Sequence, residues 1–531
     1  MPFRILISDK MSPEGLSYFT GHEGFEIVYD PEISMEALAG RIGEFDALVI
    51  RSRTHVSRAM LASSGKLKVI GRAGAGVDNV DVEAATEKGI IVMNTPGGNT
   101  LSTAEHAISM LLALARRIPQ ADHSMHAGKW DKKSIVGMEM FGKTLGVVGL
   151  GRIGRVVAEH MQAFGMDVLV HDPLLTAEAA EKMHVRSVAI EEMCRAADAI
   201  TIHAPLNDDT RGIIGRDELA MMKPGVLVVN CARGGIVDEQ ALYEALRDRR
   251  IGGAALDVFE IEPLPAENPL RGLDNVILTP HLAASTAEAQ EKVARDIAAQ
   301  IREALSGEMI RNAVNAPSVD AKTFAAIRHA LDLCWRLGRF CGQYAPEAIK
   351  SIEIVYSGSA AQYPNEPLTT SVVKGFLESH VSETVNAVNA IYLARQRDIH
   401  IAETRNSNSP DIYAGLITIR TTADSGEAHE VSGTLTQEKT PKIVVIDGRR
   451  LDIVPAGHML AIVNRDLPGF IGAVGTLLGR EEINIAQMNV GRNVPGENAL
   501  TIISVDGPVR PEVLKEIQSL HNVLRVKAIV I

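Results

Sequence analysis

The segment TLGVVGLGRIGRVVAEHMQAFGMDVLVHDP, residues 144–173, constrains the fold of this chain more than any other part of the sequence. An apolar run precedes Gly149, Gly151 and Gly154, a helical stretch begins among these glycines, and a second apolar run ends at Asp172. This order predicts a β-strand, a tight turn, a helix and a second, parallel strand. A Gly-X-Gly-X-X-Gly pattern alone is weak evidence, but an acid 18 residues after the last glycine strengthens the prediction.

A turn of this kind predicts a dinucleotide site. Glycine lets the backbone approach a pyrophosphate closely, and the N-terminus of the following helix offers unpaired N–H groups and a dipole that favour an anion. Asp172 can accept hydrogen bonds from ribose hydroxyls, and its charge would repel a 2′-phosphate. We therefore predict NAD rather than NADP as the cofactor. A tight turn that binds no ligand is the weaker alternative.

The apolar runs on either side of this segment predict the domain organisation. Residues 1–98 alternate short strand-like runs with helical stretches, which is typical of a parallel, flavodoxin-like sheet. Ser102 and Glu105 have the spacing of a capping box ahead of a long apolar helix. Residues 99–285 carry a second α/β series and residues 286–316 a further helix. We expect two doubly wound parallel-sheet domains, with the second, a Rossmann domain, inserted into the first.

The remaining residues differ from this pattern. Residues 317–452 combine an amphipathic helix around Leu331–Phe340 with polar strands, which predicts an α+β domain. Residues 457–531 run strand, helix, strand, strand, helix, strand, which is the βαββαβ order of ferredoxin-like domains.

Composition excludes several classes of function. The net charge of -12 and the pI near 5.8 argue against a nucleic-acid partner, which needs clustered Lys and Arg. No signal-peptide pattern begins the chain and no apolar run approaches the ~20 residues of a membrane span, so we expect no membrane partner and a cytoplasmic location. No metal-binding pattern such as HExxH occurs. The four cysteines show no CxxC spacing, which excludes a zinc cluster and a disulfide framework: Cys194, Cys231, Cys334 and Cys341.

Three polar residues follow strands of the second α/β series: Arg233 in NCARGGIVDE, Glu262 in DVFEIEP and His281 in LTPHLAAST. Ligands of open α/β sheets bind beyond the carboxyl ends of the strands. Each residue alone could be a surface charge, a turn residue or a buried histidine. Together they suit hydride transfer from a 2-hydroxy acid, which needs a base near neutral pKa, a carboxylate behind it and an arginine for the substrate carboxylate. We predict that His281 is the acid/base, supported by Glu262.

The motifs GRAGAGVDNVD, MNTPGGN, GLGRIG, HDP, NCARGGIVDE, ALDVFEIEP and PHLAAST resemble the D-2-hydroxyacid dehydrogenase family, in particular its long-form phosphoglycerate dehydrogenases. The resemblance implies oxidation of 3-phospho-D-glycerate to 3-phosphooxypyruvate, the entry step to serine, with Arg233, Glu262 and His281 as the catalytic trio. Ala75 and Ala204 stand where hydroxyl residues are frequent in the family. By the same matching, the NAD site is formed by Ala75, Gly149, Gly151, Arg152, Ile153, Gly154, Asp172, Ala204, Cys231, Ala232, Asp257 and Ala284.

A phosphorylated substrate needs fixed cations. Arg51 and Arg72 follow strands of the first unit and could point into the cleft between the two α/β units. The resemblance implies that they contact the phosphate or carboxylate side of the substrate, together with Arg233. The alternative is that either arginine pairs with Asp78 or Asp81 nearby.

The tail motifs NRDLPGFIGAV and EEINIAQMN resemble an ACT domain, the effector-binding module of the long form. The resemblance implies a serine effector at an interface between two such modules, bound by Asn464, Asp466 and Asn484. The alternative is a module that only dimerises. We expect a homo-oligomer, because the apolar helix after Ser102 and the tail module both favour one.

Two other functions compete with this interpretation. Another D-2-hydroxyacid dehydrogenase would act on glycerate, lactate or 2-hydroxyglutarate, but the long tail and the two cleft arginines disfavour it. An NAD-sensing scaffold or corepressor would bind the cofactor to regulate partners, but the intact catalytic trio disfavours it.

Overall fold

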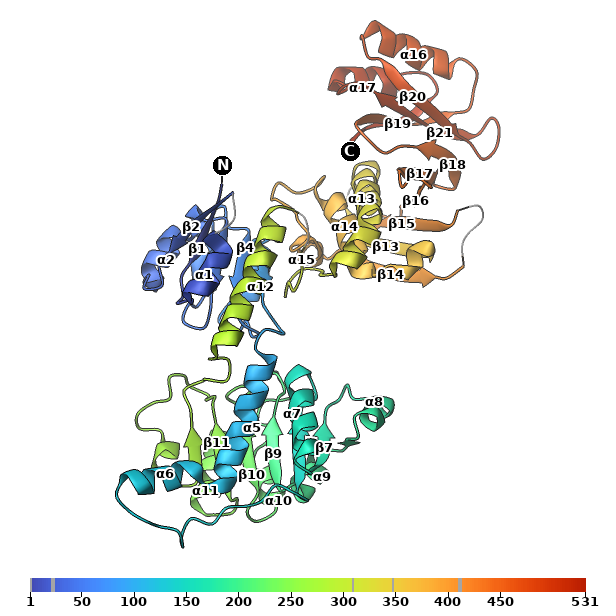
Figure 1. Ribbon diagram of the computed structural model, residues 1–531. Helices are drawn as coiled ribbons and strands as arrows, with labels where there is room; N and C mark the ends of the chain where they lie inside the picture. Colours follow the sequence, from blue (N-terminus) through green and yellow to red (C-terminus); the bar gives the residue numbers. More distant parts are fainter. Residues whose placement is uncertain (1, 21–23, 308–309, 346–347, 409–412) are drawn as a thin grey trace.

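Four sheets follow one another along the chain in the computed structural model, which describes residues 2–20, 24–307, 310–345, 348–408 and 413–531 (Figure 1). The first two sheets are parallel, the third is mixed and the fourth is antiparallel. The predicted fold class is therefore confirmed. None of the helices in the described ranges is long and apolar enough to cross a membrane.

The first sheet has five strands in the order β2-β1-β3-β4-β5, and all its pairs are parallel. Helix α12 comes from much later in the chain, yet it packs Val293, Ile297 and Ile301 into the core of this sheet (Figure 1). The strands are β1 (Phe3–Ile7), β2 (Phe25–Tyr29), β3 (Ala47–Ile50), β4 (Val69–Arg72) and β5 (Ile91–Met93). The helices are α1 (Pro13–Thr20), α2 (Met35–Arg41), α3 (Arg58–Leu61), α4 (Val82–Glu87) and α12 (Ala287–Leu305), with a 3-10 turn at Ile42–Glu44.

The second sheet has seven parallel strands in the order β12-β11-β10-β9-β6-β7-β8. Sequence order reverses on the two sides of β6, so the sheet is doubly wound. The strands are β6 (Thr144–Val148), β7 (Asp167–His171), β8 (Arg186–Ser187), β9 (Ala199–Ile202), β10 (Leu227–Asn230), β11 (Gly253–Leu256) and β12 (Val276–Leu278). The helices are α5 (Thr100–Arg116), α6 (Ile118–His126), α7 (Arg152–Ala163), α8 (Ala177–Lys182), α9 (Ile190–Ala196), α10 (Arg216–Met221) and α11 (Glu239–Arg247), with a 3-10 turn at Pro269–Gly272.

The capping box predicted at Ser102 and Glu105 is wrong. Helix α5 begins at Thr100, its N-cap residue is Asn99, and no side chain caps it. Ser102 therefore lies inside the first turn, where its hydroxyl donates to the carbonyl of Ala283 at 2.6 Å. A tertiary hydrogen bond has replaced the local one that the spacing suggested.

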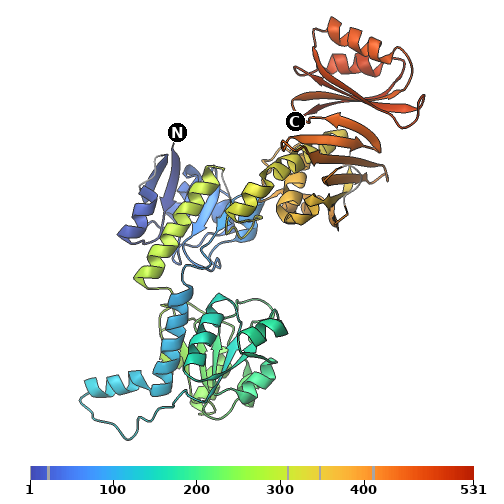
Figure 2. The same ribbon diagram turned by 45° about the vertical axis from the view of Figure 1, so that its right-hand side comes forward.

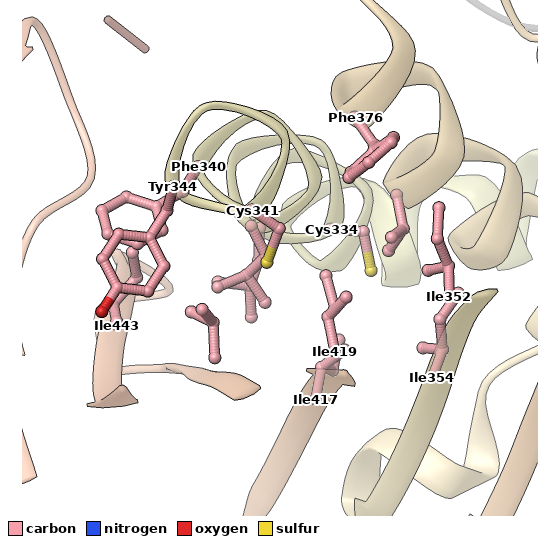
Figure 3. Packing of buried hydrophobic residues seen from close by; sticks show 14 of the residues in the cluster. Cys334, Phe340, Cys341, Tyr344, Ile352, Ile354, Phe376, Ile417, Ile419 and Ile443 are labelled. Carbon is pink, nitrogen blue, oxygen red and sulfur yellow. The ribbon is translucent and has the colours of Figure 1, made fainter. Parts of the chain in front are cut away.

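The third sheet has six strands in the order β14-β13-β15-β16-β17-β18, and only β13 and β14 pair in parallel. The helix predicted around Leu331–Phe340 is the middle of α13. Figure 3 shows Cys334, Cys341 and other side chains of α13 pointing onto the sheet. The elements are α13 (Ala321–Tyr344), β13 (Ile349–Gly358), α14 (Asn365–Leu377), α15 (Ala390–Gln396), β14 (His400–Asn406), β15 (Gly415–Ala423), β16 (Ala428–Leu435), β17 (Pro441–Ile446) and β18 (Arg449–Ile453), with a 3-10 turn at Ser359–Gln362.

The fourth sheet has the order β20-β21-β19-β22 and two helices on one face (Figure 2). Alternation along β19 divides its side chains between two cores. Leu460 and Ile462 pack under these helices, whereas Met459 and Ala461 join the core of the third sheet. The elements are β19 (His458–Arg465), α16 (Phe470–Arg480), β20 (Ile485–Gly491), β21 (Asn498–Val505), α17 (Pro511–Gln518) and β22 (Val523–Val530).

Candidate active site

A cavity of about 610 Å³ lies between the first two sheets. It receives Arg51 and Arg72 from the first unit and Arg233 and His281 from the second. Seven of the residues matched to the NAD site also line it: Ala75, Arg152, Ile153, Ala204, Cys231, Ala232 and Ala284. The structure therefore brings most of the predicted cleft residues to one place.

The three residues predicted as the catalytic trio follow neighbouring parallel strands. Strands β10, β11 and β12 are adjacent in the sheet, so their carboxyl ends share one edge. Arg233 follows the first of these strands, Glu262 the second and His281 the third. Arg233 and His281 line the cavity, whereas Glu262 contacts His281 and does not line it.

His281 and Glu262 form a close pair. The distance between His281 Nδ1 and Glu262 Oε2 is 2.7 Å, and the other carboxylate oxygen accepts the Phe259 N–H at 3.0 Å. Burial raises the pKa of Glu262, but the hydrogen bonds from His281 and Phe259 outweigh it and leave that pKa below its usual value. An ionised Glu262 makes Nδ1 the donor and leaves Nε2 as the nitrogen that can accept a proton.

Asp257 lies behind the His281 loop and does not line the cavity, although it was matched to the NAD site. Its residue is 0% exposed. The carboxylate accepts the N–H groups of Leu282 and Ala283 and the hydroxyl of Thr279. Its oxygens are thus engaged with the loop that carries His281 rather than with the cleft.

Arg51 and Arg72 are positioned by neutral groups. Arg72 Nε donates to Asn79 Oδ1 at 3.1 Å, and Arg51 Nη1 donates to the carbonyl of Lys10 at 3.0 Å. Burial, together with the nearby positive charge of Arg233, lowers the pKa of Arg72 to about 10. Both arginines remain cationic at neutral pH.

The alternative pairings of these arginines do not occur. Asp78 pairs with Arg233 across the cleft, with 3.0 Å between Oδ2 and Nε, and Asp81 pairs with Arg58. Within the described parts of the chain, neither cleft arginine forms an ion pair of its own. Four arginines line the cavity, Arg51, Arg72 and Arg233 together with Arg152 of the glycine turn, which suits anionic groups of substrate and cofactor.

The glycine turn beside β6 has the shape that a pyrophosphate needs. Gly149 has φ 88°, and a Cβ at Gly154 would collide with the carbonyl of Gly149. At Gly151, in contrast, no atom lies within 4 Å of an added Cβ, so the backbone is open where α7 begins. Asp172 accepts the Leu150 N–H at 2.7 Å, which holds the acid beside the turn. These features fit a dinucleotide.

The sequence interpretation missed His203. This residue follows β9 and lines the cavity, with its Nε2 3.0 Å from the hydroxyl of Thr201. Burial lowers the pKa of His203 to about 4, so it is neutral at physiological pH. The motif HAP at the end of an apolar run was the available signal, but the segment was interpreted only as a strand.

The three residues matched to an effector site already have partners within the chain. Asn464 is 2% exposed. Asp466 accepts from Arg492 at 2.9 Å, and Asn484 donates to Asp506 at 2.7 Å.

These residues also lie at opposite ends of the fourth sheet. Ile485, which follows Asn484, pairs with Val505, and the same valine pairs with His458 at the start of β19. The other two predicted effector residues lie at the carboxyl end of β19. One chain therefore does not bring the three together.

No group of three or more metal-ligating side chains in the described residues could hold a metal ion. The four cysteines are buried and free. Burial raises the pKa of Cys231, the cysteine at the cavity, so that it stays a thiol.

Three family models match successive parts of the chain. Residues 108–283 match the NAD binding domain of D-isomer specific 2-hydroxyacid dehydrogenases. Residues 326–447 match the D-3-phosphoglycerate dehydrogenase intervening domain, and residues 458–522 match the ACT domain.

Relatives match over the whole length. The D-3-phosphoglycerate dehydrogenase of Archaeoglobus fulgidus is 42% identical over 98% of this chain and 98% of its own. That of Bacillus subtilis is 41% identical over 99% of both chains. Among solved structures, a Thermus thermophilus protein has a TM-score of 0.55 at 33% identity and covers 59% of this chain and 99% of its own. The apo D-lactate dehydrogenase of Escherichia coli has a TM-score of 0.53 at 30% identity and covers 59% and 98%.

Proposed function

The chain belongs to the D-3-phosphoglycerate dehydrogenase family, in the long form with intervening and ACT domains, and from this premise we propose how its residues perform the reaction. The reaction is the NAD-dependent oxidation of 3-phospho-D-glycerate to 3-phosphooxypyruvate, which leads toward L-serine. The observation that carries the residue assignment is the His281–Glu262 pair, which shares one cleft edge with Arg233.

The glycine turn is the proposed cofactor site. Gly151 and the first residues of α7 would hold the pyrophosphate, because the backbone is open there and a helix N-terminus favours an anion. Asp172 would hold the adenosine ribose hydroxyls and exclude a 2′-phosphate. NAD supplies the hydride acceptor when it is bound.

His281 is the proposed base. Its Nε2 accepts the hydroxyl proton of the substrate while the hydride leaves the carbon that bears this hydroxyl. Glu262 holds Nδ1–H and stabilises the imidazolium that forms. Arg233 binds the substrate carboxylate through its planar fork and, in doing so, exchanges Asp78 for the substrate.

Arg51 and Arg72 are the proposed phosphate ligands. Both line the cavity from the first unit, and in the described chain neither guanidinium forms an ion pair with a carboxylate, although the backbone N–H of Arg51 donates to Asp9 Oδ2 at 2.5 Å. Closure of the two units would bring these arginines toward the second unit and exclude water.

We propose four domains. The first α/β unit comprises residues 1–98 and 286–316, and the second comprises residues 99–285. The mixed domain comprises residues 317–452 and the tail comprises residues 457–531. The strands of each sheet fall within one division, except that β18 ends at Ile453, one residue beyond the third, and this supports the divisions. Because α12 returns to the first sheet, the second unit is an insertion in the first.

Self-association is the proposed state in solution. Helix α6 and the segment after it project from the second unit in Figures 1 and 2. This arm exposes large apolar side chains, with Trp130 83% and Phe141 80% exposed, and such a patch favours a second copy as its partner.

Serine is the proposed effector, bound between two ACT modules. The free cysteines support a reducing, cytoplasmic compartment.

The test is a panel of NADH oxidation rates with 3-phosphooxypyruvate, hydroxypyruvate, pyruvate, glyoxylate and 2-oxoglutarate. We expect a strong preference for the phosphorylated acid, since Arg51 and Arg72 line the cavity in addition to Arg233. A preference for an unphosphorylated acid would keep the trio and reject the phosphate role of the two arginines. No turnover with any of them would instead favour the scaffold interpretation.

A further inference from the structure

Helix α5 contacts the loop that carries His281 at two points. Ser102 Oγ donates to the carbonyl of Ala283 at 2.6 Å. His106 Nε2 lies 3.3 Å from Asp257 Oδ1 and 3.4 Å from Thr279 Oγ1. Residues four apart share one helix face, so both side chains reach the loop from the same side of α5. Neither side chain lines the active-site cavity.

Asp257 joins the helix to the loop. Its carboxylate receives His106 on one side and the N–H groups of Leu282 and Ala283 at 2.8 and 2.9 Å on the other. Burial raises the pKa of Asp257, but these hydrogen bonds outweigh it and leave the pKa below its usual value. The buried charge therefore depends on every donor around it, and a lost donor leaves an unpaired oxygen away from water.

The conformation of His281 makes this support necessary. Its φ is 55°, in the left-handed region that residues other than glycine seldom adopt. The His281 N–H lies 3.0 Å from the carbonyl oxygens of both Asp257 and Thr279. These two residues are the same ones that His106 contacts, so α5 supports the loop at the points that fix the backbone of the base.

The same contacts join the two connections between the α/β units. The chain enters the second unit through α5, which begins at Thr100, and leaves it through Thr286, the N-cap of α12. Figure 1 shows α5 starting in the gap between the two units, below α12. The Ser102–Ala283 hydrogen bond connects the outgoing and returning segments within three residues of each of these points.

We propose that Ser102 and His106 are positioning residues of the reaction. They hold the segment from Thr279 to Ala283 so that His281 keeps its orientation, and they tie both interdomain connections to that segment. Closure of the two units therefore acts on the catalytic base through α5. This inference rests on the proposed role of His281.

The experiment compares Ser102→Ala, His106→Ala and His106→Gln in the full chain. We expect kcat to fall about 10- to 100-fold in both alanine variants, because small displacements of a catalytic group have effects of this size. KM and the NADH dissociation constant, measured by fluorescence titration, should change less than about 2-fold. The glutamine variant should recover most of kcat, because its amide N–H can replace the Nε2–H of histidine.

Ser432→Ala is the matched control. It removes another buried serine hydroxyl, which bonds Thr418 at 2.8 Å in the third sheet, far along the chain from the cleft. Its kcat should equal that of the parent. A fall as large as that of Ser102→Ala would show that general destabilisation explains the effect, and would overturn the inference.

The decisive readout is the loss of effect without the base. In a His281→Ala background, Ser102→Ala and His106→Ala should each change the residual kcat less than about 2-fold, because both act through His281. A full loss in that background, or an equal loss in His106→Gln and His106→Ala, would overturn the inference. If His106→Ala fails to fold, Ser102→Ala and His106→Gln carry the same test. A near-normal rate for His281→Ala alone would contradict the proposed base, whereas normal Ser102→Ala and His106→Ala beside an impaired His281→Ala would contradict only the positioning.

Discussion

The sheet beside the active-site cleft and the sheet of the C-terminal module differ in strand direction, and therefore in where the residues that follow their strands lie. In the second sheet, β10, β11 and β12 are parallel neighbours, so the residues that follow them gather at one edge. In the fourth sheet, β19 and β20 both pair with β21 in antiparallel fashion, so the end of one strand and the start of the other lie at opposite edges.

This difference decides where one chain can build a site. Parallel strands collect polar side chains from distant segments, and a single chain completes the His281, Glu262 and Arg233 arrangement. The small antiparallel module leaves Asn484 far from Asp466, so a ligand that touches both needs a second copy. A parallel sheet can thus bring candidate catalytic residues together in one chain, whereas the module would need a second copy to bring the predicted effector residues together.

The largest expected effect is on kcat, and it tests the cleft at which the parallel strands end. His281→Ala should lower kcat roughly 10²- to 10⁴-fold, because it removes the proposed general base. Steady-state NADH formation measures it. His380→Ala, the same substitution three residues after α14 and outside the cleft, serves as the control and should leave kcat unchanged. A near-normal rate in His281→Ala would contradict the proposal that the cleft of parallel strand ends supplies the base.

The cleft arginines give the next effect. Arg51→Ala or Arg72→Ala should raise KM for 3-phosphooxypyruvate about 10- to 100-fold, as expected for a lost hydrogen bond to a charged group. KM for hydroxypyruvate should hardly change, since it has no phosphate. Arg58→Ala, which removes an exposed arginine paired with Glu87, is the matched control. Equal increases for both substrates would contradict the phosphate role.

The pH dependence of stability should differ between a buried carboxylate near the cleft, Asp257, and a more exposed carboxylate in the tail, Asp466. Asp257 is fully buried, and hydrogen bonds lower its pKa below the ordinary 3.8 despite burial. Because the folded pKa lies below the unfolded one, its stabilisation is complete above pH 3.8 and is lost as pH falls through the folded value. Asp257→Asn should therefore cost about 1–3 kcal/mol of unfolding free energy at neutral pH.

The measurement is urea unfolding of both proteins from neutral to acid pH. The difference between them should shrink in acid, below the ordinary pKa of the carboxyl. Asp466→Asn is the counterpart in the tail, where an arginine hydrogen bond lowers the pKa of a more exposed carboxyl. Its effect on stability should be smaller at every pH, because water screens the pair. A pH-independent difference for Asp257→Asn would contradict the argument.

The smallest effect tests the module. If serine binds between two copies, Asp466→Ala and Asn484→Ala should each weaken inhibition by serine. Mixing the two variant chains should restore part of it, because each mixed pair keeps one site with both native residues. Rates are measured across a serine titration before and after subunit exchange. A flat response of the parent enzyme to millimolar serine would defeat the effector role, and no recovery on mixing would place the site within one chain.

Local motifs were the part of the molecule most open to prediction. The glycine turn, the strand before it and the acid after it are adjacent in the sequence, and backbone sterics largely determine their shape. That Arg233, Glu262 and His281 follow one edge of the sheet was predictable, because parallel topology places strand ends together. The capping box at Ser102 failed because a hydroxyl with a tertiary partner at 2.6 Å no longer caps its own helix.

The partners of charged groups were the least predictable part. Asp78 was considered as a partner for Arg51 or Arg72 because it is close in sequence, yet it crosses the cleft to Arg233. Asp257 was matched to the cofactor site, yet its carboxylate faces the catalytic loop. Both choices depend on which segments lie side by side, and sequence spacing does not contain that information.

The sequence by itself determined the order of four sheets, the dinucleotide turn, the candidate catalytic residues and the family. These follow from hydrophobic periodicity and from short motifs whose geometry is local. Only the tertiary structure showed that α5 contacts the His281 loop through Ser102, and Asp257 behind it through His106. It also showed that Asn484 lies at the opposite end of the fourth sheet from Asn464 and Asp466. The physical reason is that hydrogen-bond partners are chosen by distance in space, and packing of distant segments sets that distance.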